Sequence, residues 1–254
     1  MVAATLCEYK YSGCGNTFFL IDNRKGEFLP QINLIQELCY RTVDGVILLE
    51  TSPLSDFRMR IFNADGSEAE MCGNGVRCLM RFIRDLHPEI ERCTLETLAG
   101  EVTLKITEQG IRVGMPPPLD FRLNQTLEQE IYHFVNTGVP HAVFFVNDIE
   151  SSTLMVKAPA IRNHSVFAPK GANVNFVQLK NGALWLRTYE RGVEGETLAC
   201  GTGATAAALI TAKILNLSSP IQVIPRSQDP LFVEFNSELN QVALIGPAKR
   251  VNLG

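Results

Sequence analysis

Two stretches of the chain have the apolar pattern and the length of β-strands. Residues 57–62 (FRMRIF) alternate apolar and basic side chains, as a strand with one buried face does. Residues 184–189 (LWLRTY) have the composition and length of a second strand. Each is followed by an acidic, glycine-containing loop and then by a helical pattern. The sequence therefore predicts the same unit twice, once in each half.

The two helical patterns differ in their polarity. Residues 204–215 (ATAAALITAKIL) are small and apolar nearly all round, which predicts a buried central helix. Residues 76–86 (VRCLMRFIRDL) instead carry apolar side chains at helical spacing, namely Val76, Leu79, Met80, Ile83 and Leu86. Outside these two patterns, residues 29–41 (LPQINLIQELCYR) predict a further, amphipathic helix in the first half.

Turn signals divide the rest of the chain. Two strand-like runs, IYHFVN and HAVFFVN, lie on either side of the turn TGVP at residues 137–140, which predicts a hairpin. Three prolines at 116–118 cannot continue a helix and suit an extended connector. We therefore expect an α/β (α+β) fold of two similar domains, residues 1–116 and 117–244.

Composition and charge narrow the possible partners. The chain has 254 residues, 46% of them hydrophobic and 20% charged, which is typical of a globular protein long enough for two domains. A net charge of −4 and no Lys/Arg cluster argue against a nucleic-acid partner. No apolar run has the length of a membrane span, and Glu8 and Lys10 interrupt any secretory signal. We expect a cytoplasmic protein.

The seven cysteines are expected to be reduced thiols, because their number is odd and no C-x-x-C pair occurs. With only four histidines and no close Cys/His spacing, no metal site is expected. Core packing explains most of the cysteines, namely Cys7, Cys39, Cys78 and Cys93, and Cys14 is also interpreted as structural.

Two cysteines have a different setting. Cys72 in MCGNG (71–75) and Cys200 in ACGTG (199–203) each precede a Gly-polar-Gly turn at the predicted start of a helix, about half the chain apart. Unpaired backbone N–H groups there bind anions and favour a thiolate. The glycines keep each turn open, and Asn74 and Thr202 suit capping or ligand contact.

A carboxylate held between two such turns would have one sulfur on each side of its α-carbon. One thiolate could then remove the α-proton while the opposite thiol delivers another, which inverts the stereocentre. Such a pair must have unequal protonation states. The sequence thus predicts two-base proton transfer by Cys72 and Cys200.

In order along the chain, the strings GCGNTF, FNADGSEAEMCGNGVRC, GVPH, GANVNF, YERGVEGETLACGTGA and IGPAKRV resemble those of the diaminopimelate epimerases. The resemblance implies a cofactor-independent epimerase that converts LL-diaminopimelate to the meso form in lysine and peptidoglycan synthesis. It also implies two pseudo-symmetric domains, each a strand barrel around a central helix. The last strand, at about 245–254, would return to the first domain, and the enzyme would be a homodimer.

The resemblance also assigns roles by position. Cys72 and Cys200 would be the acid/base pair, and His141 and Glu190 would adjust their pKa values. The substrate would be bound by Asn16, Asn63, Gly73, Asn74, Asn173, Glu190, Arg191, Gly201 and Thr202. From the residues alone, the asparagines could equally be loop caps and His141 an ordinary turn histidine.

The sequence departs from the family pattern at Thr17, where Asp is usual, and at Val139, where Asn is usual. Both changes bear on substrate range, so a racemase of another amino acid, such as glutamate or proline, is the alternative. Two further hypotheses are a redox protein that exchanges a Cys72–Cys200 disulfide and a binding protein without turnover. The proline-racemase-like relatives usually carry a histidine in place of Asn74.

Overall fold

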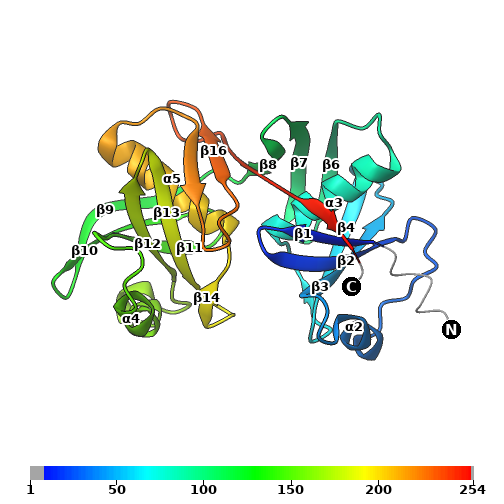
Figure 1. Ribbon diagram of the computed structural model, residues 1–254, viewed down its shortest axis with the longest axis horizontal. Coiled ribbons are helices and arrows are strands. Elements are labelled where there is room, and N and C mark those ends of the chain that lie inside the picture. The colour runs from blue at the N-terminus through cyan, green and yellow to red at the C-terminus, as the bar shows by residue number, and fades with distance from the viewer. Residues whose placement is uncertain (1–8, 253–254) are drawn as a thin grey trace. The chain divides into compact units, whose positions relative to one another are not determined.

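The computed structural model describes residues 9–252, so Cys7 lies outside the described residues. The chain divides into two compact units, one of residues 1–114 and 246–254 and one of residues 115–245 (Figure 1). Within the described residues, each unit combines a curved sheet with two α-helices. The predicted α/β (α+β) class is confirmed.

The first unit is a sheet that begins with the last strand of the chain. Helix α2 (Ile32–Cys39) follows the second strand along the chain, and α3 (Gly73–Leu86) precedes β6. The short β5 (Glu68–Ala69) pairs with one end of β4. In order across the sheet, the strands are β18 (Lys249–Val251), β1 (Lys10–Gly13), β2 (Asn16–Asp22), β3 (Gly45–Glu50), β4 (Phe57–Asn63), β6 (Arg92–Thr97), β7 (Gly100–Thr107) and β8 (Gly110–Met115).

The second unit has the same succession of pairings. Helix α4 (Thr153–Arg162), with the short 3-10 turn η1 (Ser165–Phe167), and helix α5 (Gly201–Leu215) take the places of α2 and α3. The short β14 (Gly195–Thr197) pairs with one end of β13. Across the sheet, the strands are β9 (Leu119–Leu127), β10 (Glu130–Asn136), β11 (Pro140–Phe145), β12 (Asn173–Lys180), β13 (Ala183–Glu190), β15 (Ile221–Ile224), β16 (Leu231–Phe235) and β17 (Val242–Gly246).

Strand directions show that the units are duplicates. In the first unit, β2 and β3 are parallel and are connected through α2. In the second unit, β11 and β12 are parallel and are connected through α4. Strand β4 then runs parallel to β6 through α3, and β13 runs parallel to β15 through α5. The predicted duplication is confirmed at the level of topology.

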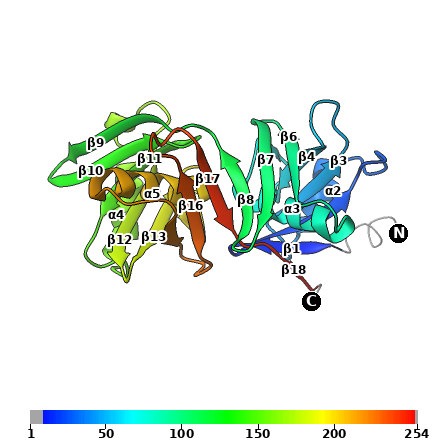
Figure 2. The ribbon, with the colours of Figure 1, turned by 90° about the horizontal axis from the view of Figure 1, so that it is seen from above.

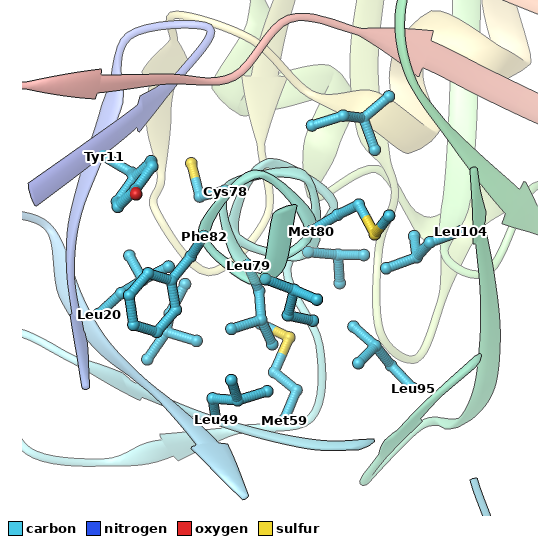
Figure 3. Packing of buried hydrophobic residues seen from close by; sticks show 14 of the residues in the cluster. Tyr11, Leu20, Leu49, Met59, Cys78, Leu79, Met80, Phe82, Leu95 and Leu104 are labelled. Atoms are coloured by element: carbon cyan, nitrogen blue, oxygen red, sulfur yellow. The ribbon is translucent and has the colours of Figure 1, made fainter. Parts of the chain in front are cut away.

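Helix α3 is the centre of the first core. Side chains from all round the helix, among them Val76, Leu79, Phe82 and Ile83, are fully buried, and strands surround them (Figure 3). The carboxyl end carries the remaining charges, such as Arg84 in the last turn. The helix predicted at 76–86 is confirmed, with three further residues at its start.

Strands β2 and β3 are covered on both faces, so their sequences are apolar without alternation. Leu20, Ile47 and Leu49 face the α3 core. The alternate residues, such as Val46 and Leu48, pack instead with α2 in a second cluster. This explains the continuous run GVILLE in β3.

Helix α5 is the counterpart of α3 in the second unit, as Figure 2 shows from above. Ten consecutive residues, Gly203–Ala212, are buried, and the strands around them include β10, β11, β13 and β16. Small side chains let these strands approach the helix from all sides. The predicted buried central helix is confirmed.

The other sequence expectations had mixed outcomes. The hairpin at 131–147 and the helix at 29–41 are present, although α2 is shorter than its pattern. Helix α4 was not predicted, because Pro159 lies inside it and obscured the buried spacing of Leu154, Ala158 and Ile161. In residues 9–252, no helix is long and apolar enough to cross a membrane.

Candidate active site

Strand direction gathers the candidate residues at one edge of each sheet. In the first unit this edge holds the start of β2 at Asn16, the end of β4 at Asn63 and the start of α3 after Cys72. In the second unit it holds the starts of β11 and β12 and the end of β13, with Cys200 before α5. The duplicated topology therefore gathers one group of candidate residues in each unit, and these groups are called the first and the second half-site.

Cys72 and Cys200 have the same local geometry. Each is the N-cap of its helix with an extended backbone, at φ −139° and ψ 118° for Cys72 and φ −117° and ψ 110° for Cys200. Their carbonyl oxygens accept from Val76 at 2.8 Å and from Ala204 at 2.9 Å. Cys200 is buried and Cys72 is half-buried. Both thiols thus lie at a helix N-terminus, where the backbone attracts anions.

An amide pair defines the first half-site. Asn74 is buried, and its Nδ2 donates to Oδ1 of Asn16 at 2.6 Å. Strand β1 comes close to this turn, because a Cβ on Gly13 would lie 2.9 Å from the carbonyl oxygen of Asn74. The close approach requires glycine and holds the turn against the sheet.

Arg77 supports this pair from below and was not anticipated from the sequence. Its side chain has no exposure, and its guanidinium donates to Oδ1 of Asn74 at 2.7 Å and to the carbonyl oxygen of Gly73 at 3.3 Å. It also contacts Sγ of Cys14 at 3.1 Å and the carbonyl oxygen of Pro247 at 3.3 Å. An arginine two residues after the Gly-x-Gly turn, beside the apolar face of the helix, was the available signal.

Asn63 and Thr17 both hold loops of the first unit in place. Nδ2 of Asn63 donates to Oγ of Ser67 at 3.0 Å, so this exposed residue caps the β4–β5 turn. The backbone N–H and hydroxyl of Thr17 both donate to Oδ2 of Asp44, at 2.7 and 3.3 Å. Thr17 therefore fixes the loop before β3.

The second half-site contains more buried polar groups. Oδ1 of Asn173 accepts from the backbone N–H of Arg191 at 2.7 Å, so a buried asparagine orders the loop that follows β13. The carbonyl oxygen of Thr202 accepts from the hydroxyl of Thr137 at 2.8 Å. The side-chain Oγ1 of Thr202 lies 3.4 Å from Sγ of Cys200. The turn is thus hydrogen-bonded on both sides.

Glu190 lies beside the Cys200 thiol. Burial raises the pKa of its carboxyl, and the nearby hydroxyl of Thr197 and thiol of Cys200 act in the opposite direction. Desolvation is the larger cause, so the carboxyl holds its proton to higher pH than an exposed glutamate does. A group of this kind next to a thiol can influence the charge of that thiol.

His141 is fully buried at the start of β11, directly opposite Asn173 on β12. Burial lowers the pKa of its imidazole to about 3. Its Nδ1 lies 3.0 Å from Nδ2 of Asn175, and the hydroxyl of Thr188 donates to Oδ1 of Asn175 at 2.9 Å. Asn175 and Thr188 were not anticipated; the available signal for Asn175 was a polar residue inside the apolar run VNFV.

The remaining described cysteines are thiols inside the structure. Burial raises the pKa of Cys78, and it raises the pKa of Cys93 to about 12. Cys93 donates to Sδ of Met80. Cys39, the last residue of α2, belongs to the second cluster of the first unit, with Val46 and Leu48. Their burial agrees with the interpretation as core residues. No group of three or more His, Cys, Asp or Glu in residues 9–252 is arranged to hold a metal.

Comparison with known proteins identifies the family. The diaminopimelate epimerase family model matches residues 8–119 and 133–250. A diaminopimelate epimerase of Chlorobaculum tepidum is 40% identical over 252 residues, covering 96% of this chain and 98% of the relative. One of Aquifex aeolicus is 40% identical over 264 residues, covering 96% and 95%. The chain belongs to the diaminopimelate epimerase family, and it is an isomerase.

Solved structures share the fold at low identity. A phenazine biosynthesis protein of the PhzF family from Bacillus anthracis has a TM-score of 0.75 at 16% identity, covering 96% of each chain. A probable proline racemase from Agrobacterium radiobacter has a TM-score of 0.67 at 17% identity, covering 97% of this chain and 91% of the other. At these identities the likeness concerns the fold.

Proposed function

We propose that Cys72 and Cys200 are the acid and the base of this enzyme, acting on one α-carbon from opposite sides. The observation that carries the proposal is the duplicated geometry, in which each thiol belongs to the N-cap of a central helix. The family assignment makes the chain an epimerase that converts LL-diaminopimelate to meso-diaminopimelate, in lysine and peptidoglycan precursor synthesis.

The proton balance of the reaction needs no further reactant. One cysteine, as thiolate, takes the α-proton and becomes a thiol, and the electron pair stays on the α-carbon beside the carboxylate. The opposite thiol gives its proton to the other face of this carbon and becomes a thiolate. The stereocentre is inverted, and the enzyme is left with the charges of its two cysteines exchanged, ready for the reverse reaction.

The backbone N–H groups of Gly73–Asn74 and Gly201–Thr202 would bind the α-carboxylate, because they lie in the first turns of α3 and α5. Asn16, Asn63, Asn173, Glu190 and Arg191 would hold the rest of the substrate. Arg191 suits a carboxylate because its planar guanidinium can donate twice. Glu190 and His141 would adjust the charges of the thiols, and no cofactor would be required.

One observation favours a second candidate substrate. Strand register makes Phe18 of the first unit equivalent to His141 of the second, because they pair with the first residues of β3 and β12. Val139, two residues before His141, is therefore equivalent to Asn16. An apolar side chain there offers no hydrogen bond to a distal polar group. A racemase of a smaller amino acid, such as glutamate or proline, would tolerate this residue.

The test is isotope exchange by the purified, reduced enzyme in heavy water without added cofactor. With LL-diaminopimelate, we expect α-deuterium and meso product, followed by NMR and chiral chromatography. Cys72→Ala and Cys200→Ala should each abolish turnover, whereas Cys93→Ala, a buried control, should not. A fully active Cys72 or Cys200 variant contradicts the mechanism, and exchange only with glutamate or proline contradicts the substrate.

We further propose that the enzyme is a homodimer in the cytoplasm and acts on its small substrate without a nucleic-acid or membrane partner. Members of the diaminopimelate epimerase family are commonly dimers. The net charge of −4 does not favour binding to the phosphate backbone of a nucleic acid. Light scattering of the purified protein tests the dimer, and a monomeric mass with full activity contradicts it.

A further inference from the structure

Three polar side chains are buried together beside the Cys200 turn: His141, Asn175 and Thr188. His141 and Asn175 have no exposure, and Thr188 is 3% exposed. They form a chain of hydrogen bonds that runs from the hydroxyl of Thr188 through the amide of Asn175 to the imidazole of His141. A Cβ on Gly203 would lie 2.6 Å from Oδ1 of Asn175 and 3.3 Å from Cβ of Cys200, so the chain adjoins the cysteine turn.

The first unit shows that the fold does not need this polar group. Gly75 corresponds to Gly203, since each is the third residue of its central helix. A Cβ on Gly75 would meet Cδ1 of Ile47 at 3.0 Å and Cδ1 of Ile61 at 3.1 Å. By strand register, Phe18, Ile47 and Ile61 hold the positions of His141, Asn175 and Thr188. Because burying polar groups is costly, their presence in one unit only calls for a reason other than packing.

Hydrogen-bonding rules determine how the amide of Asn175 is oriented and which ring nitrogen of His141 carries the proton. Nδ2 of Asn175 lies 3.1 Å from the carbonyl oxygen of Ala142 and 3.5 Å from that of Asn173, and carbonyl oxygens only accept. The amide therefore has its NH₂ group on this side, where it also meets Nδ1 of His141. A nitrogen that accepts from an amide carries no proton. The single ring proton of His141 is consequently on Nε2.

The environment keeps this imidazole neutral. Burial is the main cause that lowers the pKa of His141, and the nearby charge of Arg191 acts in the same direction. A neutral ring with Nδ1 occupied has one function left, which is to donate from Nε2.

That donor has no partner within the part of the chain that the structure describes. Nε2 of His141 is buried, yet it makes no hydrogen bond to any of residues 9–252. Leaving a buried donor without an acceptor is costly. It is the kind of group that a bound ligand satisfies.

We propose that Asn175 is a positioning residue that locks His141 as a neutral Nε2–H donor for an acceptor group of the bound amino acid. The proposal rests on the proposed function only in placing the substrate at the Cys200 half-site. It assigns to His141 a hydrogen bond and not a proton transfer. Asn175 itself touches neither substrate nor reacting atoms.

The test is a long-range ¹H–¹⁵N NMR spectrum of the wild-type enzyme with ¹⁵N-labelled histidine, near neutral pH. The chain has four histidines, and His141 is assigned by its loss in His141→Gln. His133 is an internal reference. Its Nδ1 accepts from a backbone N–H at 3.1 Å, so it shows the Nε2–H form.

We expect His141 to give the Nε2–H pattern of His133, and addition of meso-diaminopimelate to shift its Nε2 proton while Nδ1 stays unprotonated. Asn175→Leu should then give a mixture of tautomers and a fall in kcat of about tenfold, the effect of one lost hydrogen bond. Thr188→Val is the matched control: it leaves both carbonyl contacts of Asn175, so the tautomer should not change.

A protonated Nδ1 or a charged ring in the wild-type enzyme overturns the proposal, and this measurement needs no variant to fold. An unchanged tautomer in folded Asn175→Leu also overturns it. The spectrum does not depend on turnover. If the enzyme fails to exchange α-hydrogen of diaminopimelate but shows the locked tautomer, the proposed function fails while the assignment of Asn175 stands.

Discussion

Alanine at the third residue of each central helix probes the two half-sites with a matched pair of changes. Gly75→Ala and Gly203→Ala add the same methyl group at equivalent positions of α3 and α5. Helix propensity favours alanine over glycine by about 1 kcal/mol, and this gain is the same for both. Any difference between the variants therefore reports what each methyl group meets.

The neighbours differ in kind. Gly75 faces the mobile ends of Ile47, Ile61 and Met59 at 3.0, 3.1 and 3.3 Å, which can move by a few tenths of an ångström. At Gly203 the new methyl lies 2.6 Å from Oδ1 of Asn175, well inside the 3.4 Å at which ordinary contact begins. That oxygen belongs to an amide held by the hydrogen bonds described above, so it cannot yield without breaking one.

Overpacking of this severity costs about 1–3 kcal/mol, and the lost hydrogen bond adds about 1 kcal/mol. After the helical gain, Gly203→Ala should lower the free energy of unfolding by about 1–3 kcal/mol. Gly75→Ala should stay within about 1 kcal/mol of wild type, because its neighbours can adjust.

Urea unfolding measures both effects. Circular dichroism follows each variant, and fluorescence of Trp185, the one tryptophan of the chain, follows the second unit alone. If Gly203→Ala is as stable as Gly75→Ala, the amide of Asn175 is not held as described, and the argument for a rigid polar chain is refuted.

Three further predictions concern single residues. Glu190 keeps its proton in the folded state at pH values where the unfolded chain has lost it, so its contribution to stability falls as pH rises above 4.5. The melting temperature of Glu190→Gln should therefore be higher than that of wild type at neutral pH and not at pH 4.5. His141 must stay neutral in the folded state, so wild-type stability should decrease as pH falls from 6.5 toward about 3, and His141→Gln should show a shallower slope in the same acid titration. Arg77→Lys keeps the charge but not the planar fork, so the free energy of unfolding should fall by about 1–3 kcal/mol and KM should rise as Asn74 and Asn16 lose their orientation; unchanged KM in the steady-state assay would contradict that role.

The local elements could be predicted because their signals are local. The apolar spacing of α3, the uniform small residues of α5 and the alternation in β4 each reflect the burial of one segment. The helix α4 was not predicted, because Pro159 lies inside it and a proline in the sequence suggests a break in a helix.

The duplicated Cys-Gly-x-Gly turns, and with them the candidate cysteines and the family, were evident in the sequence by itself. These features are strings of adjacent residues, and their order along the chain is informative without coordinates. The topology then confirmed that the two turns begin equivalent helices.

Only the tertiary structure decided what supports each turn. Arg77 lies beneath one turn, and Asn175 and Thr188 lie beside the other, because the fold brings together, at these turns, residues that are up to 170 positions apart in the first unit and 65 in the second. The sequence determined which residues could carry the chemistry. Their orientation depends on long-range hydrogen bonds between buried groups, and such bonds have no periodicity that a sequence can show.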